Sequence, residues 1–128
     1  MITREWARAF AKEWIEAWNS HDLDRILSHY TDDVEVTSPL VAERLGRPDG
    51  VVKGKDAARE YWLPSMSLEP PLQFELNDVL VGVGQITLYY RNVGRRVVGE
   101  TLFIDGSGKA TSAFIQWSIT QDGHQSTL

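Results

Sequence analysis

The second half of the chain restricts the fold most, because four strand-like segments follow one another there with very short connections. The segments are rich in Val, Ile, Thr, Tyr and Phe and span residues 72–81, 85–91, 96–104 and 110–119. Glycine-containing turns separate them at 82–84, 92–94 and 105–108. Connections of about two to five residues join only neighbouring antiparallel strands. The sequence therefore predicts a four-stranded antiparallel meander.

The first half begins with a helical pattern. Thr3 is suited to cap a helix that ends near residues 19–21. Large aromatic residues recur every four positions along one face of this helix, namely Trp6, Phe10, Trp14 and Trp18. The stripe fits either a packed core or the wall of a ligand pocket, and the sequence leaves both interpretations open.

Shorter elements follow this helix. We expect a short helix over 23–30 after Asp22, a strand over 34–38, and a helix over 54–63 that Pro64 stops. Residues 39–53 show no clear period, so we expect a long connection of the kind that forms lids, binding loops or disordered segments. The predicted fold class is α+β, with a single domain over 1–128 in which helices pack on one face of a curved antiparallel sheet.

Composition excludes several classes of function. The chain has 128 residues, no cysteine and a net charge of −5. Disulfides, thiolate chemistry and Cys-bound zinc are therefore excluded. The pair at 95–96 is the only short basic feature, which argues against a nucleic-acid partner. No nucleophile elbow or phosphate-binding loop is present, and we expect no cofactor.

The spacing of the histidines and the lengths of the apolar segments exclude further kinds of site and location. His21, His29 and His124 lack metal-binding spacing, so we expect ordinary solvated side chains and no metal site. Residues 1–10 lack the apolar core of a signal peptide, and nowhere do about 18 apolar residues follow one another. We therefore expect a soluble, cytoplasmic protein with no membrane partner.

One carboxylate falls on an otherwise apolar strand face. Glu100 alternates in register with Val98 and Leu102. The neighbouring strands offer comparable apolar faces, made of Ile86, Leu88 and Tyr90 and of Ala113, Ile115 and Trp117. If these faces coincide, Glu100 points into an apolar space, where its pKa rises because the ionised form is costly there. A neutral carboxylic acid in such a space can donate a hydrogen bond or act as a general acid or base.

A second interpretation of this strand remains open. Its other face, which includes Val97 and Phe103, is also partly apolar. A β-bulge at Gly99 would reverse the alternation and turn Glu100 toward solvent or an arginine. The sequence alone does not decide between the two orientations.

Five short motifs in fixed order cover most of the chain. They are FAKEWIEAWNSHDLD at 10–24, YTDDVEV at 30–36, GKDAA at 54–58, YRN at 90–92 and ETLFID at 100–105. Together they resemble the SnoaL-like branch of the nuclear transport factor 2-like (NTF2-like) superfamily over about residues 5–120. The resemblance implies a cone in which the curved sheet wraps around an internal pocket closed by the N-terminal helices, and often a homodimer through the outer sheet face.

Because this superfamily includes ketosteroid isomerases, polyketide cyclases, epoxide hydrolases, dehydratases and non-catalytic domains, the fold does not set the reaction. The general-base aspartate of ketosteroid isomerases falls on Ser38 and the oxyanion-hole tyrosine on Trp14, whereas the oxyanion-hole aspartate falls on Glu100. A standard ketosteroid isomerase is therefore not expected. The Asp–Arg–Asp set of epoxide hydrolases finds no match, since Arg91 has the wrong parity. Cyclases of this branch take their acid/base carboxylate from the C-terminal strands, which makes Glu100 the candidate catalytic residue.

We thus predict a SnoaL-like protein that binds a small, largely apolar or carbonyl-containing molecule. If it is an enzyme, we expect isomerisation, cyclisation or dehydration without a cofactor, with Glu100 at the carbonyl oxygen and Ser38 and the Trp14 indole orienting it. The expected lining is Trp14, Trp18, Tyr30, Val36, Ser38, Trp62, Ile86, Leu88, Tyr90, Val98, Ile115 and Trp117. The alternatives are a non-catalytic binder and a dimeric association domain that uses Gln85, Thr87, Tyr89, Arg91, Thr101 and Phe103.

Overall fold

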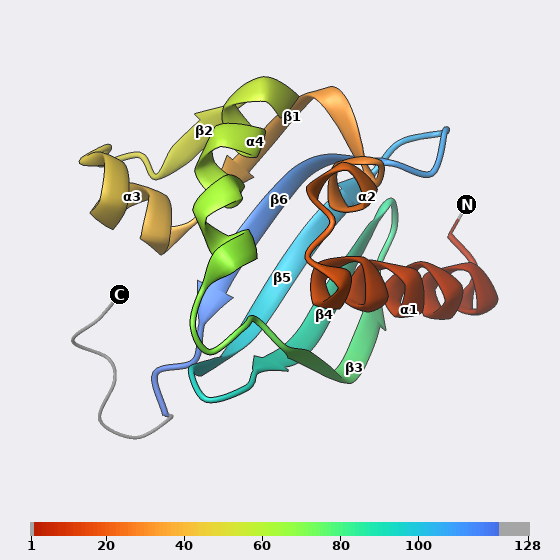
Figure 1. Cartoon of the computed structure of the whole chain (residues 1–128). Coiled ribbons are helices and arrows are strands. Elements are labelled where there is room, and N and C mark those ends of the chain that lie inside the picture. Colours follow the sequence, from red (N-terminus) through yellow and green to blue (C-terminus); the bar gives the residue numbers. More distant parts are fainter. Residues whose placement is uncertain (1, 121–128) are drawn as a thin grey trace.

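A curved sheet with helices on its concave side forms the frame of the computed structural model, which describes residues 2–120 (Figure 1). The sheet has six strands in the order β2-β1-β6-β5-β4-β3. The helices are α1 (Arg4–Ser20), α2 (Leu23–Leu27), α3 (Pro39–Leu45) and α4 (Lys55–Trp62), followed by the short 3₁₀ helix η1 (Leu63–Ser67). His124 lies outside the described residues.

The predicted meander is present, with strand ends within two residues of those expected. It consists of β3 (Phe74–Val81), β4 (Gln85–Asn92), β5 (Arg96–Ile104) and β6 (Ala110–Trp117), each antiparallel to the next. The β4–β5 register is continuous through Gly99, so no bulge reverses the alternation there. Glu100 pairs with Leu88 on one side and Ile115 on the other, and these side chains share the concave face.

The sheet is not wholly antiparallel, because β1 (Tyr30–Thr37) runs parallel to β6. Parallel neighbours need a long connection, and most of the chain separates these two strands. The strand also begins at Tyr30, before the predicted start at 34, and α2 ends at Leu27. The His29 carbonyl already accepts a hydrogen bond from Ala110 N at 2.9 Å, which shows that the chain joins β6 at this point.

The prediction of an irregular connection over 39–53 is wrong, since this segment contains α3 and the short strand β2 (Val51–Lys53). The Ser38 hydroxyl accepts a hydrogen bond from Leu40 N at 3.2 Å and caps α3, and Pro39 occupies its first turn. Gly46 ends the helix with a left-handed φ of 63°. These signals are present in the sequence, but a helix of 7 residues, about two turns, shows too little periodicity to reveal them.

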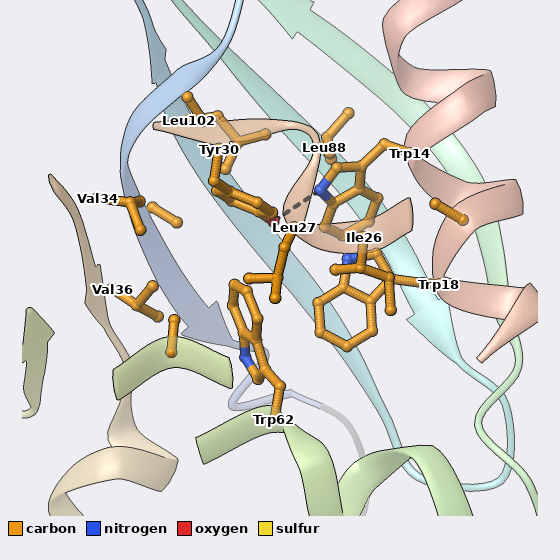
Figure 2. Close-up of a cluster of buried hydrophobic side chains, with 14 of the residues drawn as sticks. Trp14, Trp18, Ile26, Leu27, Tyr30, Val34, Val36, Trp62, Leu88 and Leu102 are labelled. Carbon is orange, nitrogen blue, oxygen red and sulfur yellow. Dashed lines mark hydrogen bonds between the residues drawn. The ribbon is translucent and has the colours of Figure 1, made fainter. Parts of the chain in front are cut away.

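Helix α1 closes one end of the cone as predicted. Thr3 caps it by accepting a hydrogen bond from Trp6 N at 3.0 Å. Its aromatic stripe meets α2, β1 and the sheet in a core of buried side chains (Figure 2). Among residues 2–120, no helix combines the length and the apolar character that crossing a bilayer requires.

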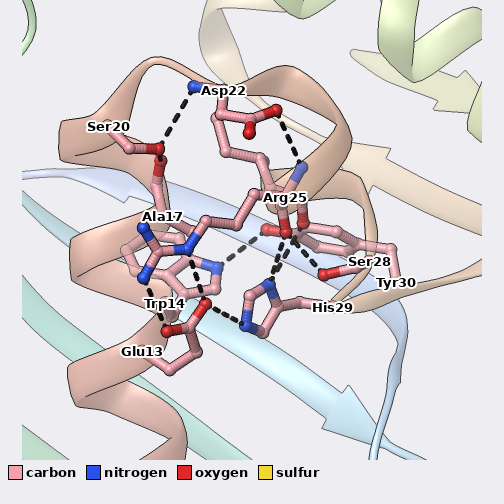
Figure 3. A network of polar contacts seen from close by, with 10 residues as sticks. Glu13, Trp14, Ala17, Ser20, Asp22, Arg25, Ser28, His29 and Tyr30 are labelled. Carbon is pink, nitrogen blue, oxygen red and sulfur yellow. Dashed lines mark hydrogen bonds and ion pairs between the residues drawn. The ribbon is translucent and has the colours of Figure 1, made fainter.

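The expectation of solvated histidines is wrong for His21 and His29. A ring nitrogen of His21 contacts the Leu72 carbonyl at 2.8 Å, and Nδ1 of His29 contacts the Arg25 carbonyl at 3.1 Å. His29 also lies beside the ion pair between Glu13 and Arg25, whose closest oxygen and nitrogen are 2.7 Å apart (Figure 3). His21 thus ties the end of α1 to the segment before β3, whereas the contacts of Glu13 with Arg25 and His29 join α1 to α2.

Candidate functional site

A cavity of about 350 Å³ lies between the concave face of the sheet and the helices α3, α4 and η1. This volume is at the lower end of the range for small-molecule sites. Of the residues predicted to line it, the following do so: Trp18, Ser38, Trp62, Tyr90, Val98, Glu100, Ile115 and Trp117. The cavity is therefore set against β4, β5 and β6 at the position of the predicted anchor.

Glu100 is buried at this cavity, with only 3% of its surface exposed. Its carboxyl oxygen Oε1 accepts a hydrogen bond from the Tyr90 hydroxyl at 2.8 Å. Burial raises the pKa of Glu100 from its ordinary 4.5 to about 7, although the Tyr90 hydrogen bond favours the ionised form and acts in the opposite direction. Near neutral pH the carboxyl group is thus poised between its acid and its base form.

The two tyrosines near Glu100 remain protonated. Burial raises the pKa of Tyr90 well above its ordinary value, and the charge of Glu100 raises it further. Burial also raises the pKa of Tyr30, and the charge of Glu100 adds to this. Both hydroxyls are therefore hydrogen-bond donors throughout the physiological range, and Tyr90 uses its proton on Glu100.

Five predicted lining residues lie in the packed core and do not line the cavity: Trp14, Tyr30, Val36, Ile86 and Leu88. The Trp14 indole Nε1 donates a hydrogen bond to the Tyr30 hydroxyl at 2.9 Å (Figure 2). Because that N–H is already bonded, it does not orient a bound carbonyl, contrary to the expectation. Strand alternation identified the correct face, but it does not say which part of the face the helices cover.

Ser38 lines the cavity, yet its hydroxyl oxygen accepts the capping hydrogen bond of α3. The partly buried Tyr61 on α4 also lines it. Burial raises the pKa of Tyr61, whereas the Ser38 hydroxyl and the charge of Arg44 lower it. The Ser38 hydroxyl therefore holds the start of α3 and the Tyr61 side chain in position, and it does not serve as a base.

Sequence reasoning missed much of the polar lining. The cavity is also bounded by Leu40, Glu43, Arg44, Tyr61, Ser65, Leu68, Leu72, Phe74, Asn92, Arg95 and Arg96. Three of these belong to α3, which was not predicted, and three lie at the β4–β5 connection, where Asn92 ends β4, Arg95 is in the turn and Arg96 begins β5. The basic pair at 95–96 was a visible signal, but only the fold shows that this turn borders the cavity.

Within residues 2–120, no three His, Asp or Glu side chains gather closely enough to hold a metal ion. The charged side chains at the cavity are arginines and glutamates. Besides these charged groups, the described lining offers hydroxyl, amide and indole groups that can form hydrogen bonds.

Comparison with known proteins identifies the family to which this chain is similar. The model of the SnoaL-like domain family matches residues 11–124. No curated protein matched. A SnoaL-like protein of unknown function from Burkholderia thailandensis is 36% identical, with a TM-score of 0.88 over 91% of this chain and 98% of that one.

Two more distant structures show the fold alone. An epoxide hydrolase/cyclase-like enzyme, SalBIII, linked to pyran ring formation in the polyether salinomycin, is 17% identical, with a TM-score of 0.70 over 94% of this chain and 96% of that one. An NTF2-like protein from Anabaena variabilis is 17% identical, with a TM-score of 0.70 over 92% of this chain and 94% of that one. The cone architecture is thus common to proteins with little sequence in common.

Proposed function

The chain belongs to the SnoaL-like domain family, and we propose that it binds a small carbonyl compound in the cavity, where Glu100 transfers a proton. The observation that carries this proposal is a buried carboxyl group with a pKa of about 7 at the wall of a cavity. Such a group is expensive to maintain for packing alone, because an apolar side chain of similar size would avoid the cost of burying it.

The walls of the cavity support a ligand with an apolar body. Trp62, Val98 and Trp117 contribute apolar surface around Glu100. A ligand in contact with them leaves water and brings its polar group toward the carboxyl group. In its ionised form Glu100 would take a proton from the carbon next to a carbonyl, and in its acid form it would return that proton to another atom of the same molecule.

This cycle covers isomerisation, and cyclisation or dehydration when the returned proton goes to a ring-closing or departing oxygen. It consumes no redox equivalent and needs no cofactor. Tyr90 stays hydrogen-bonded to Glu100 and fixes the orientation of the carboxyl group. The proposal thus assigns the reaction to Glu100 and a positioning role to Tyr90.

Exchange of carbon-bound hydrogen for deuterium tests the proposal without knowledge of the natural substrate. The ketone 1-tetralone in D₂O exchanges the protons next to its carbonyl when a base removes them, and NMR follows the exchange. We expect the wild-type protein to accelerate the exchange and Glu100→Gln to return it to the buffer rate. Glu13→Gln is the matched control, since Glu13 lies outside the cavity. Equal catalysis by Glu100→Gln and the wild type would refute the assignment.

A non-catalytic binder is the second candidate, and the role of Ser38 favours it. The position that holds the base in ketosteroid isomerases is here a helix cap, so the site has one fewer proton acceptor. In that case 1-tetralone binds, Glu100→Gln weakens its binding, and exchange stays at the buffer rate. The two candidates therefore differ in a single measurement.

We also propose that two copies associate through the outer face of the sheet. Tyr89, Phe103 and Phe114 are 44%, 41% and 39% exposed on this face. The rings of Phe103 and Phe114 contact each other edge to face, and Thr87 and Thr101 share a hydrogen bond at 2.9 Å. Sedimentation should give a dimer at tens of micromolar and a monomer for Phe103→Lys; a wild-type monomer would refute the proposal.

A further inference from the structure

Three buried side-chain atoms lack a hydrogen-bond partner among residues 2–120, and all three belong to residues that line the cavity. They are Trp18 Nε1, Asn92 Oδ1 and Arg95 Nη1. An unpaired buried polar group costs about 1–3 kcal/mol. All three residues line the cavity, but the Trp18 side chain acts as a hydrogen-bond donor toward Tyr30 and lowers the pKa of that hydroxyl. A molecule bound in the cavity can therefore supply the missing partners chiefly at Asn92 and Arg95. The polar requirement of the cavity therefore extends beyond Glu100.

Arg95 is the most informative of the three. Its Nη2 donates a hydrogen bond to the Pro70 carbonyl at 2.9 Å, which ties the β4–β5 turn to the segment that precedes β3. This contact holds the planar guanidinium group and leaves Nη1 buried without a partner. Because the group is already oriented, a ligand that binds Nη1 does not have to order it.

The charges around Arg95 add to this argument. Arg44 and Arg96 also line the cavity, and the Arg96 guanidinium lies 3.7 Å from the centre of the Trp117 ring. Neither Arg44 nor Arg95 forms an ion pair with a carboxylate in the described part of the chain. Arg44 and Arg95 thus bring two guanidinium groups to the cavity without a paired carboxylate in the described part of the chain, in a protein whose net charge is −5.

We infer that the cavity takes an amphipathic keto acid whose carboxylate binds Arg95 Nη1 while its carbonyl group faces Glu100. A monoanion fits better than a phosphate dianion because Glu43 and Glu100 oppose additional negative charge. The Asn92 amide also carries an N–H₂ group, which a half-turn about the terminal bond presents to the same carboxylate. The placement of the carbonyl group rests on the proposed function, whereas the carboxylate site rests on Arg95.

A matched pair of probes tests the inference. The keto acid 6-acetyl-2-naphthoic acid and its neutral methyl ester share the ring system and the ketone, and calorimetry measures the affinity of each. We expect the wild-type protein to bind the acid about 10- to 100-fold more tightly, the effect of a hydrogen bond to a charged group. Arg95→Leu should abolish this preference by weakening only the acid.

Two further variants separate the geometry of the Arg95 guanidinium group from its charge, and the loss of any arginine from the loss of this one. Arg95→Lys retains the charge without the planar geometry and should keep part of the preference. Arg8→Leu removes an exposed arginine of α1, away from the cavity, and should keep all of it. Thermal melts of each variant establish that it is folded before its affinities are compared.

The outcomes separate this inference from the proposed function. Equal binding of acid and ester by the wild type overturns the carboxylate site and leaves the role of Glu100 standing. A preference that survives in Arg95→Leu overturns the assignment to Arg95. Failure of both probes to bind overturns both proposals. Glu100→Gln should weaken acid and ester by the same factor, so its preference for the acid should equal that of the wild type.

Discussion

Two tryptophans on the inside of the same cone have opposite surroundings. Trp14 is 1% exposed, and its ring lies 5.3–5.9 Å from those of Trp18, Phe74 and Tyr90. Trp117 is half-buried, borders the cavity, and has the Arg96 guanidinium as its ring partner. We call the surroundings of Trp14 the packed end and those of Trp117 the cavity end.

The difference shows that the number of aromatic residues does not determine whether a cone is filled. At the packed end α1 brings its ring stripe onto the sheet, and the indole N–H of Trp14 is bonded to Tyr30. At the cavity end, rings such as Trp62 and Trp117 share the walls with polar side chains from α3 and the β4–β5 connection, and a space remains between them. The first arrangement stabilises the fold, and the second leaves room for a ligand.

The largest expected effect comes from Trp14→Ala at the packed end. Removing a fully packed indole leaves a cavity and an unpartnered Tyr30 hydroxyl, so we expect the free energy of unfolding to fall by about 3–5 kcal/mol. Urea denaturation measures this loss. If Trp14→Ala does not fold, Trp14→Phe provides the milder test. A loss below about 1 kcal/mol would contradict the distinction between the two ends.

The second effect is the pH dependence of stability caused by Glu100. A rise of the folded-state pKa from 4.5 to about 7 corresponds to about 3 kcal/mol. Between these values the folded protein holds a proton that the unfolded chain has lost, so stability falls as the pH rises from about 4.5 to about 7. Glu100→Gln cannot ionise and should lack this decline. Urea denaturation across this pH range compares the two proteins, and parallel curves would contradict the burial of an ionisable group.

The third effect belongs to the cavity end. Trp117→Ala should lower the free energy of unfolding by less than about 2 kcal/mol, because the ring is only half-buried. It should weaken binding of 6-acetyl-2-naphthoic acid methyl ester by about tenfold, since an apolar wall is lost. Calorimetry with Trp117→Ala beside Trp14→Phe gives the comparison. Stronger weakening in Trp14→Phe would invert the roles of the two ends.

The smallest effect is expected at Glu13, which lies outside both ends. The Arg25 hydrogen bond lowers the pKa of Glu13, so its contribution to stability is present above the ordinary glutamate pKa and is lost as the pH falls through the lowered value. The pair is partly exposed, and solvent screens it. Glu13→Gln should shift Tm by less than about 3 °C at pH 7, and added salt should reduce the shift. A larger, salt-independent shift would show that the pair is structurally essential.

Much of the fold follows from local signals in the sequence. Short glycine turns define the meander, Thr3 and the ring stripe define α1, and Pro64 follows α4 closely. Long-range pairing does not follow, since nothing local shows that β1 runs parallel to β6. Helix α3 was missed because capping by Ser38 and Gly46 is visible only when a helix is already suspected there.

The candidate site, like the fold, has a part that local sequence patterns indicate and a part that depends on long-range packing. Alternation along β5 made an inward-facing Glu100 one of two open orientations, and the unbroken register through Gly99 in the structure selects it. The arginines at the cavity were not predicted, because Arg44 lies on the missed helix and Arg95 in a turn. Trp14 and Tyr30 were expected at the pocket but lie in the packed core. Their burial depends on how α1 and α2 pack against the sheet, and residue spacing does not specify that packing.

Direct titration of Glu100 tests the central claim, which is that its carboxyl group is buried at the wall of the cavity. NMR of protein labelled with ¹³C at glutamate side-chain carboxyl groups follows each signal with pH, and Glu100→Gln identifies the one that disappears. We predict a midpoint of about 7 for Glu100. A midpoint near 4.5, the value of a solvated glutamate, would contradict the burial, and with it the proposed proton transfer.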